Sequence, residues 1–312
     1  MTTIRSPKEF NRVLSEKLLD LIWAQWRTLG IAAHGSESVL LLDLEALILA
    51  TEAAGAPDRR LVASSREWQI SFREWINLSR LKRLGREFIG NDVFIKRPLI
   101  EKARWESLLA DLDPFPSTEN CENQVNPRRD GSVVAPPRLK KPSLRQLYLR
   151  GIFGVNARAE IYLFLSLEGR GNSTQIAREI RYDQKNVYRI LERWTEAGLA
   201  VKEDRLKENL YSLAPDHLLW HTDAATDPFW RWQKFFLLFS RLSAASTILP
   251  WAEDAYLFSS LFRDLFPDAS AIASAAGISL PDPNLYAGQE YFSPLAEALL
   301  EILDRFVGSD LR

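Results

Sequence analysis

Apolar residues recur at every third or fourth position along most of the chain, which is the spacing of amphipathic helices. The first such stretch follows residues 6–9, a Ser-Pro-Lys-Glu capping box with proline in the first turn. Asp43 can cap a second helix, which Gly-Ala-Pro at 55–57 ends, and a third helical stretch covers residues 65–84. The pattern predicts an N-terminal helical domain over residues 1–112.

The helical pattern stops between residues 113 and 142, where six of the sixteen prolines lie among Ser, Thr, Asn, Asp and Gly. Such a composition opposes regular structure and is typical of a flexible linker. Order is expected to resume at Ser143, which begins a second capping box. The helical pattern returns in residues 216–312, with a dense aromatic run at 229–239 and a last helix that starts at Ser293. These residues are expected to form a C-terminal helical domain.

Residues 143–215 alternate short helical stretches with polar turns. Asn156 can cap one helix, Ser173 a brief second one and Asp183 a third. Two short strands around a charged tip follow, at residues 199–202 and 209–213. Helix, short helix, turn, longer helix and hairpin is the order of elements in a winged helix-turn-helix. The expected fold is therefore mainly α: a central winged helix-turn-helix with a short β-hairpin wing, flanked by N- and C-terminal helical domains.

The third helix of this segment has two different faces. Its apolar residues, spaced as one buried stripe, are Val187, Ile190, Leu191 and Trp194. The opposite face is basic and the first turn carries amides; in a major groove, Lys and Arg match guanine, whereas Gln and Asn match adenine. Glu192 opposes DNA binding unless it accepts from a cytosine or lies clear of the duplex. The candidate DNA-binding residues are Ser173, Thr174, Gln184, Lys185, Asn186, Tyr188, Arg189, Arg193, Arg205 and Lys207.

Charge is distributed unevenly along the chain. The net charge of the 312 residues is −1, but residues 138–207 hold fifteen Lys and Arg against eight Asp and Glu. A basic segment in an otherwise acidic chain is typical of a module that binds a polyanion.

The N-terminal helices carry another basic group, which consists of Arg80, Lys82, Arg83 and Arg86. We expect these residues to form a solvated helix face, and contact with DNA is the alternative.

The composition gives little support to several other classes of function. The single cysteine, Cys121, excludes an intrachain disulfide framework, and three scattered histidines are too few for most metal centres. No apolar stretch approaches the ~20 residues of a membrane span, and the first residues lack a signal-peptide pattern. We therefore expect a cytoplasmic protein without a cofactor, a metal or a membrane partner.

One acidic pair suggests an enzymatic interpretation. Gly35 and Ser36, followed by Asp43 and Glu45, are similar to the nucleotidyltransferase pattern, in which two carboxylates on one strand hold magnesium ions. That chemistry needs both carboxylates on the same side of an extended strand. The residues around them are strong helix formers without strand alternation, so we expect no enzymatic activity.

Five segments, which cover about a fifth to a quarter of the chain, carry a resemblance to a known family: residues 154–161, 173–177, 184–187, 196–200 and 210–215. They resemble the MarR- and ArsR-like winged-helix regulators of bacteria. The resemblance implies sequence-specific binding to double-stranded DNA as a dimer, usually as repression that a signal relieves. It makes Gln184, Lys185, Tyr188 and Arg189 the groove-facing candidates. Those families are small single-domain proteins, whereas this chain has long helical segments on both sides and no Cys or His cluster for metal sensing.

These observations favour a transcriptional regulator that binds double-stranded DNA as a homodimer. The dimer is expected to form through the aromatic run at 229–239 and the last helix, with Trp23 and Trp26 as the next candidates. The sequence leaves room for a small-molecule effector and does not identify one. The alternative function is a protein-interaction or antitoxin-like module whose winged helix contacts protein.

Overall fold

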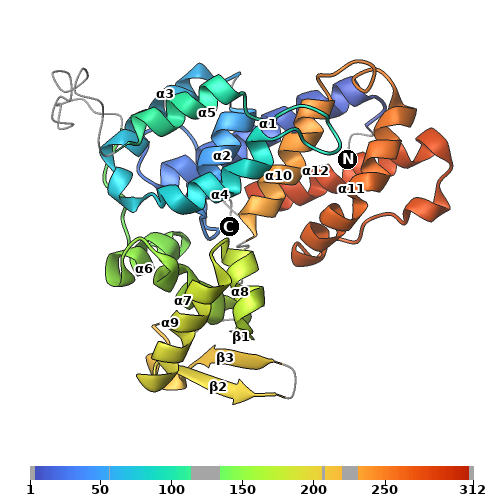
Figure 1. The fold of residues 1–312 in the computed structure, drawn as a ribbon. Coiled ribbons are helices and arrows are strands. Elements are labelled where there is room, and N and C mark those ends of the chain that lie inside the picture. Colours follow the sequence, from blue (N-terminus) through green and yellow to red (C-terminus); the bar gives the residue numbers. More distant parts are fainter. Residues whose placement is uncertain (1–3, 56, 114–133, 206–207, 220–230, 309–312) are drawn as a thin grey trace.

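The computed structural model describes residues 4–55, 57–113, 134–205, 208–219 and 231–308 (Figure 1). Within them the chain is mainly helical, with a small antiparallel sheet of three strands. In this part of the chain, none of the helices combines the length and the apolar composition that a bilayer span needs. Lys207, one of the candidate residues, lies outside the described residues, as do Phe229 and most of the linker expected at 113–142.

The described part of the N-terminal segment contains five α-helices: α1 (Pro7–Thr28), α2 (Leu44–Ala54), α3 (Arg59–Ser71), α4 (Leu78–Ile89) and α5 (Lys102–Asp111). The predicted caps of the first two are confirmed, because the side chain of Ser6 accepts from the Glu9 amide and that of Asp43 from the Ala46 amide. The single helix predicted over residues 65–84 is wrong. The chain leaves the helical conformation at Phe72 and starts again at α4, whose first turn is capped by Asn77.

The middle segment contains α6 (Arg145–Phe153), α7 (Ala157–Glu168), β1 (Arg170–Gly171), α8 (Ser173–Ile180), α9 (Gln184–Glu196), β2 (Ala200–Asp204) and β3 (Asn209–Leu213). The strands pair antiparallel in the order β1-β3-β2. The predicted caps Asn156 and Asp183 are confirmed. The left-handed exits from α7 and α9 use Gly169 and Gly198, with φ of 76° and 77°. Strand β1 was not predicted, because two residues are too short to show an alternation.

Two predicted helix starts in this segment are corrected. Ser143 caps no helix. It is buried in a short turn, its backbone carbonyl accepts a hydrogen bond from the Leu42 amide at 2.8 Å, and α6 begins two residues later. Ser173 is the first residue of α8, and the cap is Asn172, whose side chain accepts from the Gln175 amide at 2.7 Å. The neighbour Asn172 therefore caps α8 in place of Ser173, whereas α6 begins without a side-chain cap.

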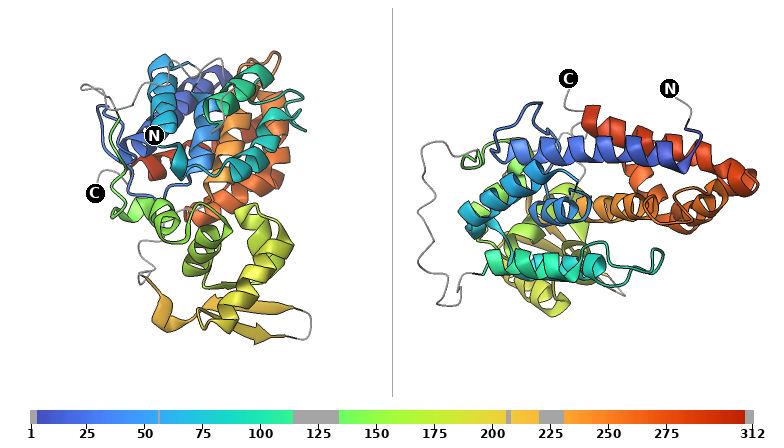
Figure 2. Two further views of the ribbon diagram at one scale, coloured as in Figure 1. Left: turned by 60° about the vertical axis from the view of Figure 1, so that its left-hand side comes forward. Right: turned by 90° about the horizontal axis from the view of Figure 1, so that it is seen from above.

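The C-terminal helices pack directly on the N-terminal ones (Figure 2). They are α10 (Trp232–Ala245), α11 (Ala255–Ala275) and α12 (Phe292–Gly308), and the last begins one residue before the predicted Ser293. Helix α12 lies along α1, and α10 lies against α2. One continuous hydrophobic cluster takes residues from all of these helices. The segments 1–112 and 216–312, expected as separate domains, therefore contribute to a single core, which we call the helical body.

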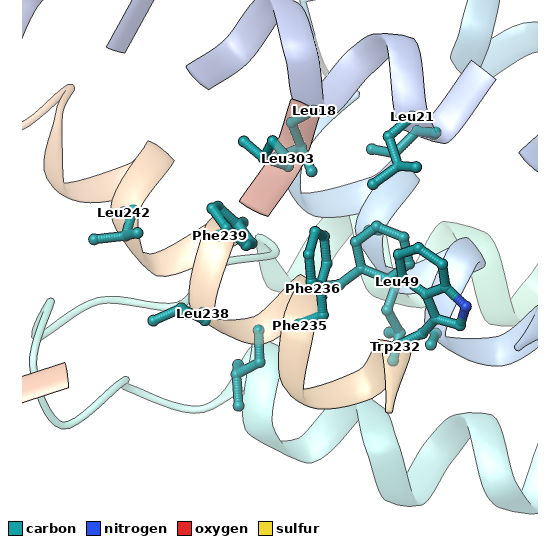
Figure 3. Close-up of a cluster of buried hydrophobic side chains, with 14 of the residues drawn as sticks. Leu18, Leu21, Leu49, Trp232, Phe235, Phe236, Leu238, Phe239, Leu242 and Leu303 are labelled. Carbon is teal, nitrogen blue, oxygen red and sulfur yellow. The ribbon is translucent and has the colours of Figure 1, made fainter. Parts of the chain in front are cut away.

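From Trp232 onward the aromatic run lies inside this core (Figure 3). Phe235, Phe236 and Phe239 are at most 1% exposed and belong to the same buried cluster as Leu18 and Leu303. The leucines and phenylalanines of α12 are buried in the same cluster. This apolar surface, expected to form a dimer interface, is therefore covered within one chain. Trp26 is likewise buried, and half-buried Trp23 donates its indole N–H to Asp58 at 2.8 Å.

A second hydrophobic cluster lies between α7, α8, α9 and the sheet. Most of its members belong to residues 157–213, which we call the α7–β3 unit. Ile161, Val187 and Leu191 are fully buried in it. The unit lies below the helical body in Figure 1, with the β2–β3 hairpin at the far end. It therefore has a core of its own, to which Leu41 of the N-terminal segment and Leu149 of α6 also contribute.

Candidate nucleic-acid interface

Helix α9 turns its predicted apolar stripe into the core of the α7–β3 unit. Asp183 caps the helix by accepting from the Asn186 amide at 3.0 Å. The stripe is buried, and its last member, Trp194, contacts the rings of Phe153 and Tyr162 with centroids 5.9 and 6.5 Å apart. The prediction for this face is confirmed. Burial of this stripe fixes how α9 is rotated about its own axis, and therefore which of its residues are exposed to solvent.

The solvent face of α9 carries a row of cations. Lys185, Arg189 and Arg193 follow at intervals of four residues, and all three are exposed. Among the described residues none offers them an ion pair or a hydrogen bond. Like charges at this spacing repel each other by some tenths of a kcal/mol, so the row costs helix stability and keeps its positive potential. We call these three residues the cationic row.

Glu192 does not interrupt the cationic row. Its carboxylate accepts from the Tyr211 hydroxyl at 2.5 Å and forms an ion pair with Lys202 at 3.1 Å, so it is turned toward β2 and β3. The hydrogen bond from Tyr211, together with Lys202, lowers the pKa of Glu192. Burial and this same contact raise the pKa of the Tyr211 hydroxyl. The carboxylate that opposed DNA binding in the sequence is thus neutralised by the hairpin.

An open groove of about 640 Å³ lies beside the cationic row, between the first turns of α8 and α9 and strand β3. The amide Nε2 of Gln184 donates to Ser173 Oγ across it at 2.9 Å. The groove brings together four of the candidates: Ser173, Thr174, Gln184 and Tyr188. It also contains residues that the sequence analysis missed: Asn172, Gln175, Arg178, Glu208, Asn209 and Tyr211.

The remaining candidates lie apart from this groove. Asn186 is half-buried in the first turn of α9, and Arg193 is on the last turn. Arg205, at the tip of the hairpin, forms an ion pair with Glu203 at 2.9 Å. The hairpin tip also carries Asp204, so it offers little net positive charge. The cationic character of this side of the unit comes from α9.

A cluster of buried charges joins the α7–β3 unit to the helical body. It consists of Asp43, Glu45, Arg80, Arg150 and Glu160, and we call it the buried charge cluster. Arg80 donates through both terminal nitrogens to Asp43, each at 2.6 Å. Arg150 donates to Glu45 at 2.7 and 2.8 Å and to Glu160 at 2.6 Å. Arg80, predicted on a solvated face, is therefore buried and 3% exposed.

The buried charge cluster explains the acidic pair of the N-terminal segment. Asp43 and Glu45 lie at the start of helix α2, as the helix formers around them predicted, and both are paired with arginines. Burial alone would raise the pKa of Glu45, but Arg150 and Arg80 outweigh it and lower that pKa to about 2. The described residues include no group of three or more His, Cys, Asp or Glu that could hold a metal ion.

The same contacts hold the turn between α8 and α9. Arg80 Nε donates to the Ile180 carbonyl at 3.3 Å, and the Asn77 side chain donates to the Tyr182 hydroxyl at 2.5 Å. From α10, Gln233 Nε2 donates to the Glu179 carbonyl at 2.9 Å. The orientation of α9 is thus fixed relative to the helical body.

Comparisons of the chain with protein-family models, with curated proteins and with solved structures find no match.

Proposed function

We propose that the α7–β3 unit is a winged helix-turn-helix that binds double-stranded DNA, with α9 in the major groove and the β2–β3 hairpin as the wing. The order of α7, α8, α9 and the hairpin supports this assignment, as does the pairing of β1 with β3. A major groove about 12 Å wide admits one α-helix. The solvent face of α9 is then the surface that reads the duplex.

The observation that carries the proposal is the cationic row. Lys185, Arg189 and Arg193 extend along the solvent face of a helix whose opposite face is anchored in a core. Their charges are not neutralised by other described residues, whereas Glu192 is paired. Unpaired lysines and arginines release counterions from DNA phosphates when they bind, and this release supplies much of the affinity. Gln184 adds an amide of the kind that pairs with adenine.

The biological role that we infer is regulation of transcription by a homodimer. Two copies of α9 on a pseudo-palindromic site would stand about one DNA turn apart, roughly 34–36 Å. Two-fold symmetry doubles the short sequence that one helix reads. The helical body would provide the dimer contacts through surfaces other than the buried faces of α10 and α12.

The decisive experiment is selection of bound sequences from random duplexes with the full-length protein. We expect one enriched motif, and an affinity for it whose logarithm falls linearly with the logarithm of salt concentration. The double variant K185A/R189A should lose this binding, whereas K8A/R12A, a pair of the same types and spacing on α1, should keep it. Absence of any salt-dependent DNA binding would instead support the protein-interaction alternative.

A further inference from the structure

Helix α4 of the helical body is attached to the residues that immediately precede α9. Arg83 Nη1 donates to the Arg181 carbonyl at 3.0 Å, and its guanidinium lies 5.2 Å from the ring centroid of Tyr182. The Arg181 side chain returns to α4 and pairs with Glu87 at 2.8 Å. Helix α9 begins at Gln184. One face of α4 is therefore fixed beside the N-terminus of the proposed recognition helix.

The neighbouring face of α4 carries two exposed cations. Lys82 and Arg86 are one helical turn apart and point away from the buried Leu81, Leu84 and Phe88. Neither cation forms an ion pair or hydrogen bond with any other residue that the structure describes. Figure 1 shows α4 directly above α8, the helix that leads into the turn before α9.

We propose that Lys82 and Arg86 of α4 form a second DNA-contacting surface, which binds the phosphates that flank the groove occupied by α9. This inference rests on the proposed function. A duplex carries one negative charge per about 1.7 Å of its axis, so phosphates lie on both sides of any helix in the major groove. The helical body thereby acquires a role in binding, in addition to its role as a scaffold.

The surface binds the sugar-phosphate backbone and not the bases. Lysine acts on phosphate as a point charge, and arginine offers a fork of donors. Phosphate contacts set the position and the affinity of a protein on the duplex, and they carry no sequence information. The contribution of α4 must therefore be equal on the selected site and on a random duplex.

The test compares two matched pairs of substitutions. K82A/R86A removes the α4 cations, and K8A/R12A removes a lysine and an arginine at the same spacing from α1, which lies along α12 in the helical body (Figure 2). Equilibrium affinity is measured over a series of salt concentrations on the selected site and on a random duplex. Each phosphate contact contributes about 0.9 to the slope of log K against log salt. We expect K82A/R86A to reduce the slope by roughly 1.8 on both duplexes.

K8A/R12A should leave that slope unchanged. Both variants should keep the melting temperature of the parent nearly unchanged, because all four residues are exposed and the one ion pair lost, Arg12–Glu16, is a surface pair. An unchanged slope in K82A/R86A, with DNA binding intact in the parent, would overturn the role of α4 and leave the proposed function standing. A changed base preference in K82A/R86A would also overturn it. If the parent protein does not bind DNA, the proposed function and this inference fail together.

Discussion

Arg189 stands in the middle of the cationic row, one helical turn from Lys185 and one from Arg193. If its guanidinium contacts a base, Arg189→Ala should weaken binding to the selected site by about 1–3 kcal/mol, because a bidentate arginine discriminates among bases by that amount. Affinity measurements on the selected site at one salt concentration provide the check. Arg12→Ala on α1 is the control. Unchanged affinity in the double variant K185A/R189A would remove α9 from the interface.

Arg150 is the residue on which the buried charge cluster depends most. It is fully buried and holds both Glu45 and Glu160. Arg150→Met would leave buried Glu160 without an ion pair and Glu45 with Arg80 as its one arginine, so the free energy of unfolding should fall by about 3–5 kcal/mol. Arg158→Met on the exposed side of α7 is the matched control, and its effect should stay within about 0.5 kcal/mol. Denaturant unfolding of both variants measures the difference; equal stabilities would contradict this account of the cluster.

At the level of elements, α9 combines a structural face with a binding face, and Trp194 belongs to the structural one. Its ring packs on Phe153 and Tyr162. Trp194→Ala should cost about 3–5 kcal/mol of stability, as large-to-small core substitutions do. The variant should lose thermal stability and DNA binding together, as a melting curve and a binding assay would show. Full stability with selective loss of binding would mean that the two faces have been assigned the wrong way round.

At the scale of the whole molecule, the helical body requires both ends of the chain. Removal of residues 227–312 would expose the faces of α1 and α2 that α12 and α10 cover. We expect a chain that ends at residue 226 to lose the cooperative unfolding of the helical body and to keep at most the transition of the α7–β3 unit, whereas a chain that ends at Gly308 should unfold like the full-length protein. Fluorescence of Trp26 and Trp68, with the other tryptophans replaced, distinguishes the two; a cooperative transition reported by these residues would indicate that residues 1–112 fold without the C-terminal helices.

Self-association is a separate prediction at this scale. A regulator that reads a pseudo-palindrome should be a dimer, so light scattering at micromolar concentration should give twice the mass of one chain. The interface must use surfaces other than those of Phe235, Phe236 and Phe239, which are covered in the core. A monomer that binds a non-palindromic site tightly would contradict the dimer and leave the DNA-binding proposal intact.

Local features of the chain were predictable from the order of its residues. The caps at Asp43, Asn156 and Asp183 depend on a side chain and an amide two or three residues apart. The two faces of α9 depend only on the helical period, so both the buried stripe and the exposed cations could be assigned in advance. The groove could not, because Asn209 and Tyr211 reach it only when β3 folds back beside α8.

The sequence by itself determined that the chain is mainly helical, where α1, α2, α7 and α9 begin, and which side of α9 is apolar, because these properties follow from contacts within one or two helical turns. Only the tertiary structure decided that Arg80 is buried, since its partner Asp43 stands 37 residues away, and that Arg150 meets Glu45 across 105 residues. It also decided that the two ends of the chain share one core. Pairings between residues so far apart in the sequence depend on how the helices pack. Hydrophobic periodicity shows which face of a helix is apolar, but it does not determine which other helix packs against that face.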